Sequence, residues 1–238
     1  MRDLSNKKIL IFADSHLHTK FKKGWWKEIK RKILEADIVI INGDFLQFNK
    51  NNNIDDFISI WGDKLFSLLK TKTILIYGNN DLKKYYKHKE SSLSVESLEQ
   101  VSFISGGKKF CVQHGHRVID YKKEKRKAFW IILYRKIKKK AKQFPKVYWF
   151  IKGKEEKRGK IYKILRYLFQ KQYSFRYEKL KGYVLENKNK ADIFIFGHIH
   201  KPKHNLKNNF IIVGAFTNKH KRFVFIKNGE IEFFNEEC

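Results

Sequence analysis

Cysteine, acidic residues and long apolar runs are all scarce in this 238-residue sequence. Only two cysteines occur, Cys111 and the final residue Cys238, so we expect no structural disulfide and a reducing compartment. No apolar run reaches the roughly 18 residues that a membrane-spanning helix needs. The first eight residues are polar, which predicts no secretory signal. Together these absences favour a cytoplasmic protein.

The shortage of acidic residues leaves a formal net charge of +29, from 53 basic and 24 acidic residues. Such a charge attracts anionic partners, which include nucleic acid, acidic membrane surfaces and phosphorylated substrates. The alternative explanation is a general enrichment in lysine, with the lysines on solvated faces. Hydrophobic residues make up 42% of the chain, which is enough for a core and argues against general disorder.

Short apolar runs without polar alternation are typical of strands that are covered on both faces. The sequence predicts such strands at 8–13, 38–41, 73–77 and 193–196. Apolar side chains at helical spacing predict helices over 25–34 and 54–69, and a further helix is expected at 94–100.

Two hairpins are expected later in the chain, over 101–113 and 222–234, the second around Asn228-Gly229. Strands that alternate with helices predict an α/β layered fold. With the hairpins added, the expected architecture is a two-sheet sandwich flanked by helices.

Residues 117–190 have a composition of their own, with 26 basic residues, six acidic residues and 15 aromatic residues. Two basic amphipathic helices are expected there, around 129–140 and 161–169, and they would form a cap or lid. Such helices often lie on a membrane surface, although their apolar stripes can also pack on the core. The predicted organisation is therefore a core of residues 1–116 and 191–238 with a helical insertion at 117–190.

Five polar stretches each follow a predicted strand. They are Asp14-x-His16, Gly43-Asp44, Gly78-Asn79, His114-Gly115-His116 and Gly197-His198-Ile199-His200. Ligand sites in open α/β sheets gather at the carboxyl ends of the strands. Carboxylates, an amide and histidines together suit Mn²⁺, Fe²⁺ or Zn²⁺. Seven ligands fit two ions that share a carboxylate, and such a site cleaves phosphoryl bonds with an activated water.

The order of these stretches resembles the calcineurin-like metallophosphoesterase superfamily, from about Lys8 to Phe234. The resemblance implies an α/β (α+β) fold, a four-layer sandwich of two mixed β-sheets flanked by helices, with a helical lid insertion. It also implies that a metal-bound water attacks the substrate. It assigns Asp14, His16 and His200 to one metal, Asn79, His114 and His198 to the other, and Asp44 as the bridge.

Within the superfamily, the sequence is similar to bacterial UDP-2,3-diacylglucosamine pyrophosphatases of lipid A biosynthesis. The chain length, the basic insertion and the ending Ile212-Val213-Gly214-Ala215-Phe216 carry this likeness. It implies hydrolysis of UDP-2,3-diacylglucosamine to UMP and 2,3-diacylglucosamine 1-phosphate. The implied cofactors are two divalent ions, Mn²⁺ foremost, with Fe²⁺ or Zn²⁺ as alternatives. It further implies peripheral association with the inner face of the membrane through the insertion.

Two positions depart from the family pattern. Asn80 stands where the superfamily usually has histidine and the lipid enzymes have arginine, so the side-chain acid is unassigned. The expected substrate contacts are Asn79, Asn80 and His198. His116 stands where the lipid enzymes tend to have aspartate, and it is either a structural histidine or a spare acid.

Two other functions stay open. A phosphodiesterase or nuclease of the same superfamily could bind nucleotides or nucleic acid through the basic, aromatic insertion. An inactive membrane-surface binding module could keep the fold without the chemistry.

Overall fold

The structure is a computed structural model that describes residues 1–20, 23–49, 51–119, 160–217 and 220–237. Contacts within the chain divide it into two units, one made of Met1–His116 with Lys181–Cys238 and the other of Arg117–Leu180. The first unit contains both β-sheets and every predicted site residue. The first predicted helix of the insertion, at 129–140, lies outside the described residues.

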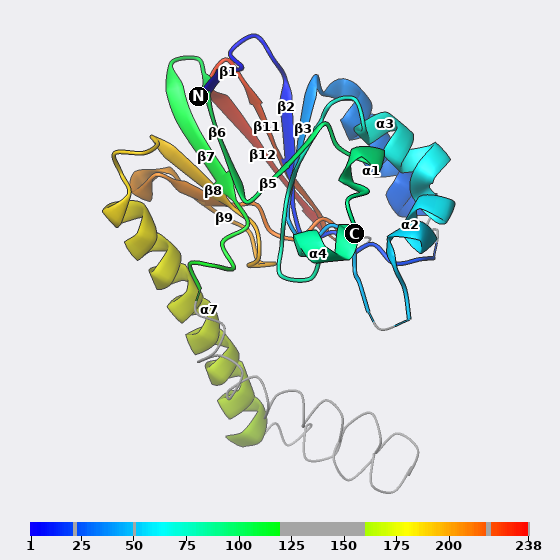
Figure 1. Cartoon of the computed structure of the whole chain (residues 1–238). Coiled ribbons are helices and arrows are strands. Elements are labelled where there is room, and N and C mark those ends of the chain that lie inside the picture. Colours follow the sequence, from blue (N-terminus) through cyan, green and yellow to red (C-terminus); the bar gives the residue numbers. More distant parts are fainter. Residues whose placement is uncertain (21–22, 50, 120–159, 218–219, 238) are drawn as a thin grey trace, which may run out of the picture. The chain divides into compact units, whose positions relative to one another are not determined.

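Sheet B has the strand order β12-β11-β2-β3-β4-β5 (Figure 1). Strands β2, β3, β4 and β5 run parallel to one another, whereas β11 is antiparallel to both β2 and β12. The strands are β2 (Ile9–Phe12), β3 (Ile38–Asn42), β4 (Thr73–Ile76), β5 (Glu96–Leu98), β11 (His220–Lys227) and β12 (Glu230–Glu237). The pairing of β11 with β12 confirms the predicted C-terminal hairpin.

Sheet A has the strand order β1-β6-β7-β8-β10-β9. Its hairpin of β6 and β7 confirms the other predicted hairpin, and β7, β8 and β10 run parallel. The strands are β1 (Arg2–Asp3), β6 (Gln100–Ser105), β7 (Lys108–Gln113), β8 (Ile193–Phe196), β9 (Lys203–Asn205) and β10 (Phe210–Ile212).

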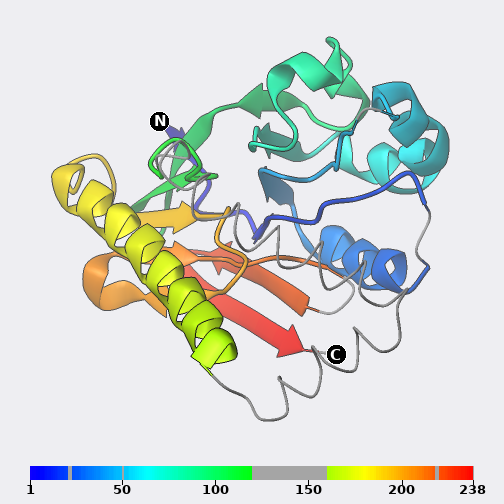
Figure 2. The same ribbon diagram turned by 90° about the horizontal axis from the view of Figure 1, so that it is seen from below.

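Both faces of sheet B are covered. Leu10 and Phe12 of β2 belong to a core shared with the helices, whereas Ile9 and Ile11 belong to a second core between the two sheets. Figures 1 and 2 show the helices α1, α2 and α3 on the face of sheet B that turns away from sheet A. The two mixed sheets flanked by helices confirm the predicted fold class. The shorter helices are α1 (Lys23–Glu35), α2 (Ile54–Trp61), α3 (Ser67–Leu69) and α4 (Lys83–Tyr86).

The helix predicted over 54–69 forms, but a π-helical turn at Gly62–Phe66 interrupts it between α2 and α3. Asn53 begins α2 with a capping box that it shares with Asp56. The buried side chains Phe57, Trp61, Leu65 and Leu69 are four residues apart. An α-helix of 3.6 residues per turn would rotate such a series away from the core, and the wider π turn brings it back.

The helix predicted at 94–100 is wrong. Glu96–Leu98 is the strand β5, which runs parallel to β4, and Gln100 begins β6. The main-chain amide of Val95 donates to the carbonyl of Thr73, and that of Tyr77 donates to the carbonyl of Leu98. The free edge of β4 therefore supplies main-chain partners that outweigh the local helical preference.

The longest described helix is α7, Lys160–Glu186, with 27 residues. The second predicted amphipathic helix, at 161–169, falls inside it. Near its end, the ring of Tyr183 lies edge-on to Phe194 and Phe196 of β8, with centroids 6.0 and 6.3 Å away. Among the described residues, no helix combines the length and the apolarity that crossing a bilayer requires.

Candidate dinuclear metal centre

Seven candidate ligands lie at the carboxyl ends of five strands from both sheets. Sheet B supplies residues that follow β2, β3 and β4, and sheet A supplies residues that follow β7 and β8. This is the edge where open α/β structures bind ligands. The candidates are Asp14, His16, Asp44, Asn79, His114, His198 and His200.

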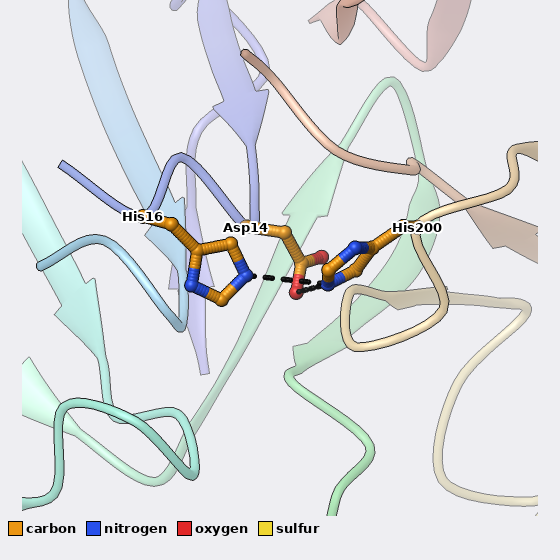
Figure 3. A group of neighbouring side chains, drawn as sticks. All are labelled: Asp14, His16 and His200. Carbon is orange, nitrogen blue, oxygen red and sulfur yellow. Dashed lines mark hydrogen bonds and ion pairs between the residues drawn. The ribbon is translucent and has the colours of Figure 1, made fainter. Parts of the chain in front are cut away.

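The first group consists of Asp14, His16 and His200, whose side chains point toward one another (Figure 3). The Nε2 atoms of His16 and His200 are 3.2 Å apart, and Nε2 of His200 is 3.4 Å from Oδ1 of Asp14. Two ligands on one ion, with bonds of about 2.1 Å, lie roughly 3.0–3.4 Å apart. The spacing therefore suits a single cation between these atoms.

The second group consists of Asp44, His114 and His198, all buried. Nδ1 of His114 lies 2.8 Å from the carbonyl oxygen of Asn42. Because a carbonyl only accepts, this nitrogen carries a hydrogen, and in the neutral ring it is Nε2 that has the free lone pair. That Nε2 atom is 3.5 Å from Oδ1 of Asp44. The hydrogen bond to Asn42 therefore fixes the tautomer that a metal ligand needs.

Asp44 faces both groups. Its Oδ1 is 3.5 Å from Nε2 of His114, and its Oδ2 is 3.9 Å from Nε2 of His16. The two oxygens of one buried carboxylate are thus turned toward different histidines. Asp44 therefore lies within reach of both groups, and its role as a bridge stays a prediction.

Several buried polar atoms at this edge accept no hydrogen bond from any described residue. They are both carboxylate oxygens of Asp14, Oδ1 of Asn79 and Nε2 of His114. Buried polar atoms normally have partners, because desolvation without one is costly. All are electron-pair donors, so divalent cations would satisfy them, and the donor set fits Mn²⁺, Fe²⁺ or Zn²⁺.

The ionised carboxylates of the site favour cations, whereas a protonated histidine must first lose its proton. Although burial opposes ionisation, contact with His114 and the donors of Asn80 hold the pKa of Asp44 well below its usual range. Burial tends to lower the pKa of His114, but Asp44 and Asp14 raise it to about 9. The contact with Asp14 raises the pKa of His200, whereas burial lowers that of His16. An ionised Asp44 is ready to bind a metal.

Four candidate ligands have left-handed backbone conformations. The φ angles are 53° at Asp14, 45° at His16, 52° at Asp44 and 62° at His198. This region is unfavourable for residues other than glycine, and such strain concentrates at functional sites. A left-handed residue changes the direction of the chain just after the strand. The strained backbone therefore helps to place these side chains in the site.

Two of the neighbouring glycines leave room for ligands. A Cβ atom on Gly43 would overlap the ring of His114, and one on Gly78 would overlap Oδ1 and the amide nitrogen of Asp44. Gly43 has a φ of +77°, but Gly78 is required by close approach.

Asn80 lies against Asp44. Its main-chain N–H donates to Oδ1 at 2.8 Å, and its side-chain amide donates to Oδ2 at 2.5 Å. The predicted substrate contact of Asn80 therefore stays a prediction, as do those of Asn79 and His198.

His116 lies beside the second group and is partly exposed. The centroid of its ring is 5.4 Å from that of His114 and 6.5 Å from that of His198. The structure brings His116 to the site, and its role as an acid stays a prediction.

Asp81 has an important place that the sequence analysis missed. It is fully buried, and Oδ1 accepts from the amides of Gly78 and Asp44 while Oδ2 accepts from those of Phe45 and Leu46 and from the hydroxyl of Tyr86. Burial, followed by the charge of Asp44, raises its pKa to about 7. Asp81 ties the loop after β3 to the loop after β4. The available signal was its position in Gly78-Asn79-Asn80-Asp81, directly after a strand.

A family model described as calcineurin-like phosphoesterase matches residues 7–202. No curated protein matches the chain. Among solved structures, an archaeal phosphodiesterase is 17% identical, with 96% of this chain and 99% of that chain covered and a TM-score of 0.47. Wild-type Vps29 from Entamoeba histolytica, in complex with Zn²⁺, is 14% identical, with 97% and 98% covered and a TM-score of 0.46. The family match spans every predicted site residue, from Asp14 to His200.

Proposed function

The chain belongs to the calcineurin-like phosphoesterase family, and on that premise we propose that it hydrolyses the pyrophosphate bond of UDP-2,3-diacylglucosamine. Water adds to one phosphorus and the P–O–P bridge breaks, so that UMP and 2,3-diacylglucosamine 1-phosphate leave. Metal-dependent hydrolysis of phosphoesters, without a specified substrate, is the activity of the family. The observation that carries the proposal is that the two oxygens of Asp44 face histidines of both ligand groups, His16 of the first and His114 of the second.

The residues divide the work at this centre. Asp14, His16 and His200 would hold one divalent cation, Asn79, His114 and His198 would hold the other, and Asp44 would contact both. When bound, the cations supply Lewis acidity and lower the pKa of water. Burial of Asp14 and Asp44 keeps bulk water from their oxygens, while the His200 side chain is 57% exposed. Substrate would therefore approach from the side of His200.

The choice of a lipid-linked substrate rests on the chain between the two halves of the site. Residues 117–190 carry 26 basic and 15 aromatic residues, which suits a molecule with an anionic head and apolar tails. In the described part, α7 exposes Phe175 by 41% and Leu185 by 59% on a helix rich in lysine. Exposed apolar side chains beside lysines support peripheral binding to an anionic membrane surface.

The direct test is product analysis. Purified protein with Mn²⁺ and UDP-2,3-diacylglucosamine in detergent micelles should release UMP and the lipid monophosphate in equal amounts. In H₂¹⁸O, one of the two products should carry one ¹⁸O atom. Turnover of bis(p-nitrophenyl) phosphate without any release of UMP would show a phosphoesterase of different specificity and contradict the proposal. Parallel assays with Fe²⁺ and Zn²⁺ identify the metal.

A second candidate is a phosphodiesterase or nuclease that acts on nucleotides or nucleic acid. The interleaving of 15 aromatic with 26 basic residues in 117–190 favours it, since single strands bind through charge and base stacking. Binding to oligonucleotides that weakens steeply with salt, without binding to anionic vesicles, would support this candidate. Vesicle binding with weak oligonucleotide binding supports the lipid substrate.

A further inference from the structure

A basic segment follows the loop that carries Asn79 and Asn80. It begins with α4 and continues through Lys87, His88 and Lys89. Lys89 forms an ion pair with Asp55, whereas Lys83, Lys84 and Lys87 are exposed and form no ion pair with any described residue. Three lysines without an ion-pair partner among the described residues therefore lie within eight residues of Asn79 in the sequence.

An aromatic stack lies on this segment. The ring of Tyr85 is stacked on Phe48, with centroids 5.3 Å apart and planes at 25°. Phe57 and Tyr86 lie edge-on to Phe48, with ring centroids 5.2 and 5.5 Å from its own. These contacts hold Phe48 in place behind Tyr85. Tyr85 is 37% exposed, and Nζ of Lys84 is 5.1 Å from its ring centroid. The outer ring of the stack thus meets solvent, and the cation of Lys84 lies over it.

The stack is connected to the metal-ligand loops through direct contacts. The hydroxyl of Tyr86 donates to Oδ2 of Asp81 at 3.0 Å, and Oδ1 of Asp81 accepts from the amide of Asp44 at 3.0 Å. Phe48 lies four residues after Asp44 on the same loop. Figure 1 shows α4 at the edge of sheet B where the loops after the parallel strands emerge. The aromatic stack of Tyr85 and Phe48 and the two ligand groups therefore lie at the same edge of the sheet.

We propose that Tyr85, backed by Phe48 and flanked by Lys83, Lys84 and Lys87, is a subsite that stacks on the base of a nucleotide substrate. The inference rests on the proposed function in so far as the substrate carries a nucleotide. A planar base can stack on an exposed aromatic ring, and the phosphates of the nucleotide can bind the three lysines, which have no ion-pair partner in the described part of the chain. An acyl chain carries no charge that the three cations could bind. A phosphate without a base has no planar group that could stack on the ring.

Equilibrium binding distinguishes the contribution of the Tyr85 ring to affinity from that of the lysine charges. Calorimetric titration in Mn²⁺ compares UMP with ribose 5-phosphate, which has the same phosphate and sugar but no base. The wild-type protein and Tyr85→Phe should bind UMP about tenfold more tightly than ribose 5-phosphate. Tyr85→Leu should bind both about equally. Leu206→Ala, a change at an exposed apolar side chain in the 3-10 turn between β9 and β10, should keep the preference.

Equal binding of UMP and ribose 5-phosphate to the wild-type protein would overturn the subsite, as would a full preference in Tyr85→Leu. Thermal denaturation of each variant verifies that it is folded. Hydrolysis of a base-free alkyl phosphodiester, measured on the same preparations, tests the phosphoesterase chemistry independently. Hydrolysis without any base preference contradicts the subsite alone, and base preference without release of UMP from the lipid substrate contradicts the proposed reaction alone.

Discussion

Asn80 holds both oxygens of Asp44, one through its main-chain N–H at 2.8 Å and the other through its side-chain amide at 2.5 Å. The carboxylate that lies between the two ligand groups therefore has its orientation set by its neighbour. An amide at position 80 brings no charge, but its N–H₂ group donates the hydrogen bond that Oδ2 accepts.

Replacing this donor should weaken metal binding more than folding. In Asn80→Ala, Oδ2 of Asp44 loses its side-chain partner, and we expect metal affinity or turnover to fall about 10- to 100-fold. Titration with Mn²⁺ and steady-state kinetics measure the change. Asn51→Ala, at an exposed asparagine, is the matched control and should behave like the wild-type protein. Unchanged affinity in Asn80→Ala would show that the main-chain donor suffices.

Asp44→Asn should abolish turnover while the fold is kept. The substitution preserves shape but removes the charge that faces both His16 and His114. Activity on a generic phosphodiester and metal content per chain are the measurements, with circular dichroism as the check on folding. Wild-type turnover in this variant would remove Asp44 from the centre and would support a binding module without catalysis.

Removing metal ions should lower stability as well as activity. Because Asp14 and His114 have buried atoms without a hydrogen-bond partner among the described residues, bound cations should stabilise the folded chain. At a free Mn²⁺ concentration of about 100 times Kd, the gain per site is about 2.7 kcal/mol. Thermal melts with EDTA and with Mn²⁺ measure it, and Asp14→Asn should show a smaller gain. Identical melting temperatures under both conditions would contradict cation binding at these residues.

A paired glycine experiment separates steric from conformational effects. Gly78→Ala places a Cβ atom against Asp44, so we expect a loss of about 1–3 kcal/mol in the free energy of unfolding together with weaker metal binding. Gly182→Ala meets nothing within 4 Å on helix α7 and should gain about 0.5–1 kcal/mol. Denaturant unfolding of both variants gives the values. Equal changes in the free energy of unfolding for the two variants would mean that the loop after β4 shifts to accommodate the added Cβ atom.

Much of the architecture follows from local sequence. Apolar runs such as Ile193–Phe196 and the Asn228-Gly229 turn carry their own conformational preference, so the long strands and both hairpins could be predicted. Glu96–Leu98 could not be, because this short strand exists only through its pairing with β4. The π turn at Gly62–Phe66 likewise depends on which side chains must reach the core.

The candidate site was predictable as an inventory of ligand types but not as a network. Asp14, His16 and His200 follow strand ends, which gives their place in the fold. The hydrogen bond from the amide of Asp44 to Asp81 connects residues that are 37 positions apart in the sequence, and no local pattern encodes it. The same holds for the close approach of Gly78 to Asp44, which only the packed loops reveal.

Each ligand group draws on both sheets: Asp14 and Asp44 come from sheet B, while His114, His198 and His200 come from sheet A. Neither group exists until the two sheets have closed on each other. An intermediate with only one sheet formed would hold at most two of the three ligands of either group. Tight binding of two cations is therefore a late event in the assembly of the chain, and it can serve as a signal that the sandwich is complete.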